Sequence, residues 1–259
     1  MEEIKKTEGY VALLDVLGFR ELVNRDDKLS EIKKYIHTVE SLFENNHKYD
    51  SLQYLLFSDN LIINTKTNSD DDFHNLVKAC SSLLFDLLQL QIAVRGVVSY
   101  GSFLRSPTTR KGVILAGKPI VEADHYQHIQ NWVGTILAPS VIKFYNNIKP
   151  HSTITPFNPG ENRNQWLQRQ PLAINIKHWG GIPFHTESSN IHSTYEGYVL
   201  VPMHADASTR EAIFSSLDST IENLEIMKSQ SPDPSTQFKY THSNDFLRFV
   251  KQSWNLMHL

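Results

Sequence analysis

The sequence predicts an α+β fold in which helices cover an antiparallel sheet. Short apolar runs have the length of strands, and longer segments carry apolar residues at helical spacing. Turn residues between neighbouring strands favour hairpins. The expected order through about residue 137 is β-α-β-β-α-β-β-α-β. This order lacks the regular βαβ alternation of a doubly wound parallel sheet.

Two acidic residues follow expected strands. The apolar run 10–14 ends at Asp15 and indicates a buried strand. Expected strands at 52–57 and 61–63 flank the segment Ser58-Asp59-Asn60, whose short polar side chains favour a turn. We therefore expect Asp59 at the tip of a hairpin.

The remaining segments predict further helices and strands. Helices are expected over about 29–43, 70–87 and 118–130, and strands over 92–100, 112–116 and 135–137. After a stretch rich in Asn, Pro, Gly and Gln at about 146–171, strands are expected at 172–176 and 198–201 and helices over about 208–227 and 244–256. We divide the chain into a core, 1–145, and an extension packed on it, 146–259.

Composition is that of an ordinary globular protein. The chain has 259 residues, 40% hydrophobic and 20% charged, which is enough for a sizeable core. A net charge of -3 provides no global basic field, so nucleic acid and membrane are not expected partners. The charged start lacks an apolar signal core, and no stretch is long enough to span a bilayer, so a cytoplasmic location is expected.

Cysteine and histidine usage argues against two kinds of site. Cys80 is the single cysteine, which excludes an intrachain disulfide, and it lies on the apolar face of an expected helix. Of the twelve histidines, His125 and His128 are three apart on an expected helix. No third ligand stands at useful spacing, so zinc is not predicted.

Asp15 and Asp59 could converge if their strands are neighbours. Paired carboxylates with a backbone carbonyl are the usual oxygen ligands for Mg²⁺ or Mn²⁺ bound with a triphosphate. Each aspartate by itself is equally compatible with a turn former or a helix cap.

Several motifs then resemble those of class III nucleotidyl cyclases, over about residues 9–142. The segment 13–19, LLDVLGF, resembles the first metal-binding motif of that family, and 57–60, FSDN, resembles its second metal-binding hairpin. Segments similar to the next core strand, the glycine-led helix and the following strand stand at 95–101, 117–123 and 133–140.

The resemblance implies a ferredoxin-like cyclase core, a cyclase activity and its site. Two Mn²⁺ or Mg²⁺ ions would be held by Asp15, Asp59 and the backbone of Val16, with both aspartates catalytic. The backbone of Leu17, Gly18 and Phe19 would bind the β- and γ-phosphates, although Gly18 is also compatible with a plain tight turn. The active site would lie between two subunits of a homodimer.

Departures from the family motifs concern base and ribose recognition. Leu55 stands where purine cyclases carry a Lys, and Ile114 where they carry an Asp or Cys. Val121 and His125 stand at the positions where the family carries an Asn and an Arg that orient the ribose and stabilise the transition state. Other cations that could act in place of the Arg, or be surface charges, are Arg95, Arg105, Arg110, Lys111 and Lys118.

The sequence keeps both aspartates but lacks the residues that recognise a purine. In this combination it resembles the pyrimidine cyclases of bacterial Pycsar anti-phage systems. This resemblance implies cyclisation of UTP, or of CTP, to a second messenger that activates an effector protein. Tyr54 is our candidate for contacting the base, with Arg95 and His125 as further substrate-binding residues.

Three alternatives stay open. The chain could be a non-catalytic cyclase-homology module that binds a nucleotide or a partner, or it could be a purine cyclase. It could also be another palm-like enzyme. The absence of a GG[DE]EF-type hairpin argues against a diguanylate cyclase, and the acidic balance argues against a template-bound polymerase.

Overall fold

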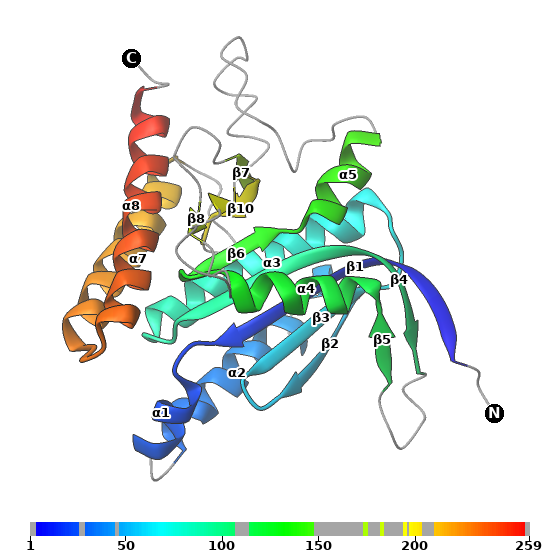
Figure 1. The fold of residues 1–259 in the computed structure, drawn as a ribbon, viewed down its shortest axis with the longest axis horizontal. Helices are drawn as coiled ribbons and strands as arrows, with labels where there is room; N and C mark the ends of the chain where they lie inside the picture. The colour runs from blue at the N-terminus through cyan, green and yellow to red at the C-terminus, as the bar shows by residue number, and fades with distance from the viewer. Residues whose placement is uncertain are drawn as a thin grey trace.

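The computed structural model confirms the α+β class (Figure 1). It describes residues 4–25, 29–44, 47–106, 114–147, 173–175, 182–183, 194–195, 197–203 and 210–256. Residues 107–113 and most of 148–196 lie outside the described residues, including the start of the strand expected at 112–116 and the ends of the one expected at 172–176.

An eight-stranded sheet organises the molecule, in the order β2-β3-β1-β4-β6-β10-β7 with β5 paired to β4. The strands are β1 (Lys5–Val16), β2 (Leu52–Phe57), β3 (Asn60–Thr65), β4 (Val94–Arg105), β5 (Leu115–Gly117), β6 (Gly134–Leu137), β7 (Ala173–Asn175) and β10 (Tyr198–Leu200). Strands β8 (Ile182–Pro183) and β9 (Thr194–Tyr195) form a separate pair. The β4–β6 pairing is parallel, because a helix carries the chain back between them, and the other described pairings are antiparallel.

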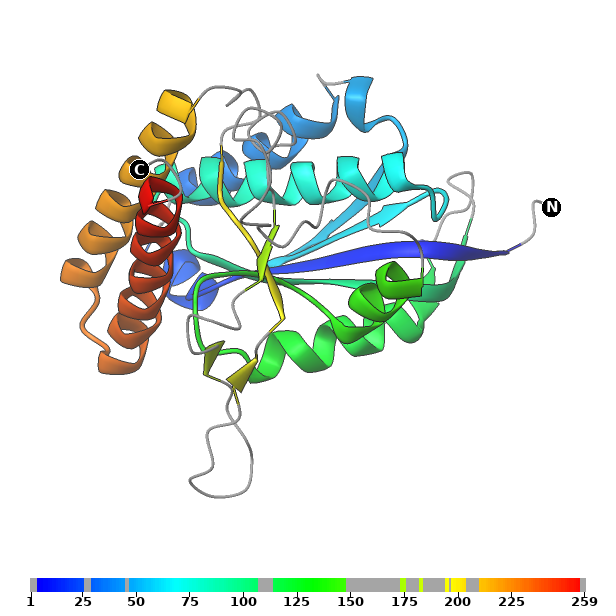
Figure 2. The same cartoon turned by 90° about the horizontal axis from the view of Figure 1, so that it is seen from above.

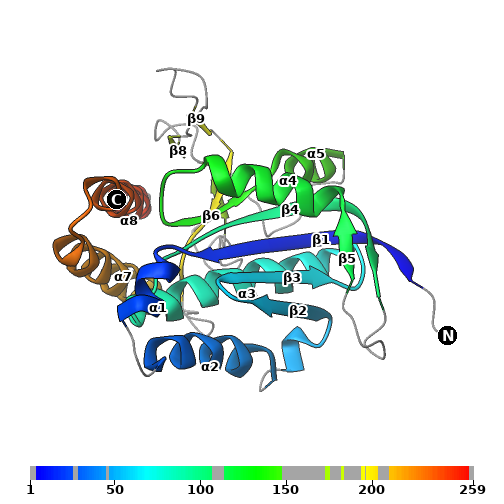
Figure 3. The same cartoon turned by 60° about the horizontal axis from the view of Figure 1, so that its bottom comes forward.

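Helices cover both faces of this sheet. They are α1 (Phe19–Arg25), α2 (Ser30–Glu44), the 3₁₀ turn η1 (His47–Tyr49), α3 (Asp70–Gln89), α4 (Lys118–Ile129), α5 (Pro139–Asn147), α7 (Arg210–Gln230) and α8 (Pro234–Leu256). Figure 3 shows α4 on one side of the sheet and α2 and α3 on the other.

Alternation along β1 determines which side chains meet which helix. Tyr10 packs on Phe73 of α3, with ring centroids 4.7 Å apart. On β4, the hydroxyl of Ser99 donates to the carbonyl of Pro119 in α4 at 2.6 Å. Because Ser99 pairs with Val11, the odd-numbered residues of β1, including Asp15, lie on the α4 face.

The extension completes the sheet and is bonded to the core. Strands β10 and β7 continue the sheet beyond β6. The hydroxyl of Ser81 in α3 donates to the carbonyl of Val201 at 2.5 Å, and Gln89 accepts from Ser219 and Asn223 of α7. In Figures 1 and 2, α7 and α8 lie beside the end of the sheet where β1 finishes. The division of the chain at residue 145 stays a prediction.

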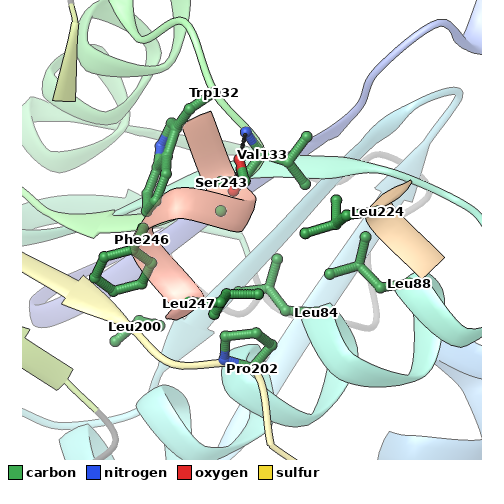
Figure 4. Close-up of a pocket in the computed structure, with 11 residues that line it drawn as sticks. Leu84, Leu88, Trp132, Val133, Leu200, Pro202, Leu224, Ser243, Phe246 and Leu247 are labelled. Carbon is green, nitrogen blue, oxygen red and sulfur yellow. Dashed lines mark hydrogen bonds between the residues drawn. The ribbon is translucent and has the colours of Figure 1, made fainter. Parts of the chain in front are cut away.

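A small apolar cavity marks the contact between extension and core (Figure 4). Its lining comes from α3, the segment before β6, β10, α7 and α8: Leu84, Leu88, Trp132, Val133, Gly134, Leu200, Pro202, Leu224, Ser243, Phe246 and Leu247. The hydroxyl of Ser243 is engaged with Val133. A cavity with no convergent free polar groups does not suit a nucleotide, so we assign it to packing.

Several elements differ from expectation, and the clearest differences are in β4, α1 and α8. Strand β4 continues through Gly101 to Arg105, because β1 is long enough to pair along its whole length, from Lys5 opposite Arg105. Helix α1 follows the Gly18 turn directly and was not predicted. Helix α8 begins at Pro234, well before residue 244, because proline is tolerated in a first helical turn and Asp233 accepts from the Thr236 N–H at 2.8 Å.

Candidate active site

The structure brings Asp15 and Asp59 to the same end of two adjacent strands. Asp15, near the end of β1, pairs with Asn60, the first residue of β3. Asp59 precedes Asn60 in a two-residue turn in which Ser58 adopts a positive φ of 57°. The N–H of Val16 donates to the carbonyl of Asp59 at 3.1 Å, which holds the turn against β1. The backbones of the two aspartates are therefore neighbours.

Arg95 is the third charged member of this site. It pairs with Asp15 across β4 and β1, and its Nε donates to Asp15 Oδ2 at 2.9 Å. The two side chains are only 20% and 14% exposed, respectively. Burial raises the pKa of the Asp15 carboxyl above its ordinary value, Arg95 opposes that rise, and the charge of Asp59 adds to it. Burial therefore disfavours the charged form of Asp15, and a second cation beside Arg95 would stabilise it.

Tyr35 of α2 is a buried residue on which the charges of both aspartates act. Its side chain is 2% exposed. Burial raises the pKa of the Tyr35 hydroxyl, and the charges of Asp59 and Asp15 raise it further. Tyr35 lies on the apolar face of a helix, as core residues do, so its local sequence gives no sign of a role at the site.

The turn after β1 offers fewer free amides than expected. The N–H of Leu17 donates to the carbonyl of Ala93 at 2.9 Å, so it is already engaged. Gly18 has a φ of 71°, a conformation that favours glycine, and its carbonyl accepts from the Leu22 N–H as α1 begins. Among the described residues, no backbone carbonyl accepts from the N–H groups of Gly18 and Phe19, so these two remain the candidates for binding phosphate.

Tyr54 lies on the wrong face to contact a base beside Asp15. It pairs with Ile63, on the face that α2 and α3 cover, and its ring stacks on Phe43 of α2 at 4.8 Å. Burial raises the pKa of its hydroxyl, as do the charges of Glu44 and Glu40 and a side-chain hydrogen bond with Glu44. Our expectation for Tyr54 was wrong because strand alternation turns its side chain away from Asp15.

Leu55 is the β2 residue on the Asp15 face. It pairs with Ile62, which in turn pairs with Leu13 of β1, two residues before Asp15. The position where purine cyclases carry a Lys therefore faces the site, and here it is apolar.

On α4, His125 and Val121 point into solvent in the single chain, and Val121 is 70% exposed. The structure does not bring His125 to Asp15. His128, one turn further along, is the histidine whose charge lowers the pKa of Asp15 slightly. Its Nδ1 lies 2.8 Å from the carbonyl of Asp124.

The donor set fits a divalent cation that substrate helps to hold. Among the described residues there is no cluster of three or more His, Cys, Asp or Glu side chains. The chain offers the carboxylates of Asp15 and Asp59 and the backbone carbonyl of Val16. Such a partial all-oxygen set suits Mg²⁺ or Mn²⁺, which keep water and take phosphate oxygens.

Similarity to known proteins is found among solved structures. No protein-family model and no curated protein matches the sequence. The chain is similar to the adenylyl cyclase CyaB from P. aeruginosa, with 11% identity over 62% of this chain and 92% of that one and a TM-score of 0.47. It is also similar to the dimeric guanylyl cyclase domain of RhoGC from Blastocladiella emersonii, with 14% identity, 57% and 88% coverage and a TM-score of 0.41.

A third similar structure is the guanylate cyclase domain of RhGC from Catenaria anguillulae in complex with GTP, with 12% identity, 56% and 84% coverage and a TM-score of 0.42. Similarities with such low sequence identities and TM-scores do not identify an activity. The proposed function therefore depends on the residues of the site. None of the helices that the structure describes combines the length and hydropathy needed to cross a membrane.

Proposed function

We propose that this chain is a nucleotidyl cyclase that converts UTP, or CTP, to the 3′,5′-cyclic monophosphate and pyrophosphate. The observation that carries the proposal is the placement of Asp15 and Asp59 at one end of adjacent strands, held by the Val16 N–H to Asp59 carbonyl bond. Two carboxylates kept close, at a cost in repulsion, favour a cation-binding role over a structural one.

In the proposed site Asp15, Asp59 and the carbonyl of Val16 would hold two Mn²⁺ or Mg²⁺ ions. Such ions, when bound, lower the pKa of the ribose 3′-OH and neutralise charge on the phosphates. Arg95, positioned by its strand pairing with Asp15, would contribute its positive charge to binding of the triphosphate. Gly18 and Phe19 donate their backbone N–H groups to the phosphates.

The preference for a pyrimidine rests on Leu55. A purine held against an apolar side chain would leave its polar edge groups unpaired, which costs binding free energy. Because Tyr54 lies on the other face of the sheet, we do not propose it as the residue that contacts the pyrimidine. A purine cyclase is the second candidate, because the backbone of the site is equally able to position ATP or GTP.

A homodimer would complete the site. Phe57 beside the Asp59 turn is 77% exposed and Val121 on α4 is 70% exposed, which makes them the two most exposed large apolar side chains among the described residues. A second copy would cover them and bring His125 of one subunit towards the aspartates of the other. The cyclic product would serve as a second messenger for an effector in anti-phage defence, in keeping with the resemblance of the motifs.

A product assay tests the proposal. Purified chain is incubated with Mn²⁺ and each of the four nucleoside triphosphates, and products are identified by mass spectrometry. We expect a cyclic pyrimidine nucleotide, and its loss in Asp15→Ala and Asp59→Ala variants that retain the native circular dichroism spectrum. Cyclic AMP or GMP instead would establish the purine alternative. Nucleotide binding without turnover would establish the non-catalytic module.

A further inference from the structure

Helix α8 of the extension is fixed to the strand next to Arg95. The hydroxyl of Ser243 accepts from the N–H of Val133 at 2.8 Å and lies 2.9 Å from the Val133 carbonyl (Figure 4). Val133 immediately precedes Gly134, the first residue of β6, and Gly134 is the pairing partner of Arg95 on β4. The anchor of α8 is therefore one strand away from the Arg95–Asp15 pair.

Lys239 lies one helical turn before this anchor. Residues four apart share a helix face, and Ser243 Oγ is 2.9 Å from the Lys239 carbonyl. Since Ser243 points to the start of β6, Lys239 is on the side of α8 that faces the core. Its side chain is partly buried, which is uncommon for lysine without a paired acid.

Other cations of α8 are engaged away from the site. Arg248 pairs with Glu225 of α7 at 3.4 Å, and Lys251 is in an ion pair with Asp218 of α7. Among the described side chains, Lys239 has no carboxylate within ion-pair distance. Arg248 and Lys251 thus form ion pairs between α8 and α7, whereas Lys239 forms none among the described residues.

We propose that Lys239 is a triphosphate-binding residue, supplied by the extension to the site formed by Asp15, Asp59 and Arg95. This inference rests on the proposed nucleotidyl cyclase function and adds to it a role for α8. In the proposed site the charges of Asp15 and Asp59 are balanced by those of Arg95 and Lys239. When the carboxylates bind divalent ions, Arg95 and Lys239 are left to bind the polyphosphate.

The electrostatic environment of Lys239 agrees with this position. Burial lowers the pKa of its ammonium group, the charge of Arg95 lowers it further, and Asp233 and Asp15 raise it. The charges of Arg95 and Asp15 act on Lys239 although they belong to strands far away in the sequence. Two cations whose charges act on each other are typical of a site that binds an anion with several charges.

The test is a binding measurement that requires no turnover. Isothermal titration calorimetry in the presence of Mn²⁺ compares inorganic tripolyphosphate with uridine monophosphate on the full chain. The variants are Lys239→Met, which keeps the aliphatic stem, Lys239→Arg, which keeps the charge, and Lys143→Ala, which removes an exposed helical lysine on α5. Circular dichroism and melting temperature verify that each variant is folded.

We expect tripolyphosphate to bind the Lys239→Met variant about ten-fold more weakly than the unaltered chain, as for loss of one charge-assisted contact. The Arg variant should stay near the unaltered affinity, Lys143→Ala should match it, and monophosphate affinity should be the same in all. Equal tripolyphosphate affinity in the Met variant would overturn the role of Lys239 while the proposed function stands. If the unaltered chain neither binds tripolyphosphate nor cyclises any nucleotide, both proposals fail.

Discussion

The Nε atom of Arg95 donates to Oδ2 of Asp15 at 2.9 Å, across the pairing of β4 with β1. Because the pair is mostly buried, loss of Arg95 leaves an anion without its cation. We expect Arg95→Gln to lower the free energy of unfolding by about 3 kcal/mol in EDTA. Mn²⁺ should restore much of it, since the ion binds the folded chain and occupies the vacated carboxylate.

Urea denaturation with and without Mn²⁺ measures this effect. The matched control is Arg248→Gln, which breaks the exposed pair with Glu225 and should cost no more than about 1 kcal/mol under either condition. A loss for Arg95→Gln that Mn²⁺ does not reduce would show that Asp15 is not a cation ligand.

Asp59→Asn should separate catalysis from folding. The amide keeps the size of the carboxylate and an oxygen that can accept from Asn60 Nδ2, as Asp59 Oδ1 does at 3.1 Å. It removes a charge that raises the pKa of Asp15, so the metal-free fold should be no less stable. Turnover should fall at least about 100-fold, as for removal of an electrostatic catalytic group. A destabilised variant with normal turnover per folded molecule would assign Asp59 to the turn alone.

Tyr54 should matter for stability and not for base choice. Tyr54→Ala removes the stack on Phe43 and the contact with Glu44, and we expect a loss of about 2 to 3 kcal/mol. Tyr54→Phe keeps the stack and should lose about 1 kcal/mol. In both variants the ratio of kcat/KM for UTP and CTP should equal that of the unaltered chain. A changed ratio in Tyr54→Phe would return Tyr54 to the substrate site.

Cys80 is fully buried on α3, and burial raises the pKa of its thiol to about 12. The folded-state pKa lies above the unfolded one, so folding keeps the thiol protonated. This contribution to stability is complete below the unfolded pKa and is lost as pH rises towards 12. At pH 8, Ellman's reagent should react with Cys80 only at the rate of unfolding. Rapid reaction in native buffer would contradict its place in the core.

The parts of the site that depend on local pattern were predictable. An apolar run ending at Asp15 and a polar turn around Asp59 carry their own strand and hairpin signals. The two aspartates can lie near each other only if β1 and β3 are neighbours, and the structure pairs these strands. The side of the sheet that each strand residue faces follows from alternation. Tyr54 was misassigned because its neighbour Leu55 is the residue that shares the face of Asp15.

The parts that depend on distant pairing were not predictable from one sequence. The contact between Arg95 and Asp15 requires the register of β4 on β1, and nothing near either residue specifies it. Tyr35 and Lys239 belong to helices whose position depends on packing against distant parts of the chain. Their local pattern is that of ordinary amphipathic helices. Asp233 and Pro234 begin α8, well before the expected helix start at residue 244.

Ser243→Ala tests whether α8 positions Lys239. The change leaves the buried N–H of Val133 without its acceptor, which should cost about 2 kcal/mol of stability. It should also weaken tripolyphosphate binding, although less than Lys239→Met, because a loosened helix places Lys239 less well. In the double variant the two effects on affinity should not add, since Ser243 acts through Lys239. Calorimetry on the four members of this cycle measures the coupling. Full additivity would mean that Ser243 stabilises the fold without positioning Lys239.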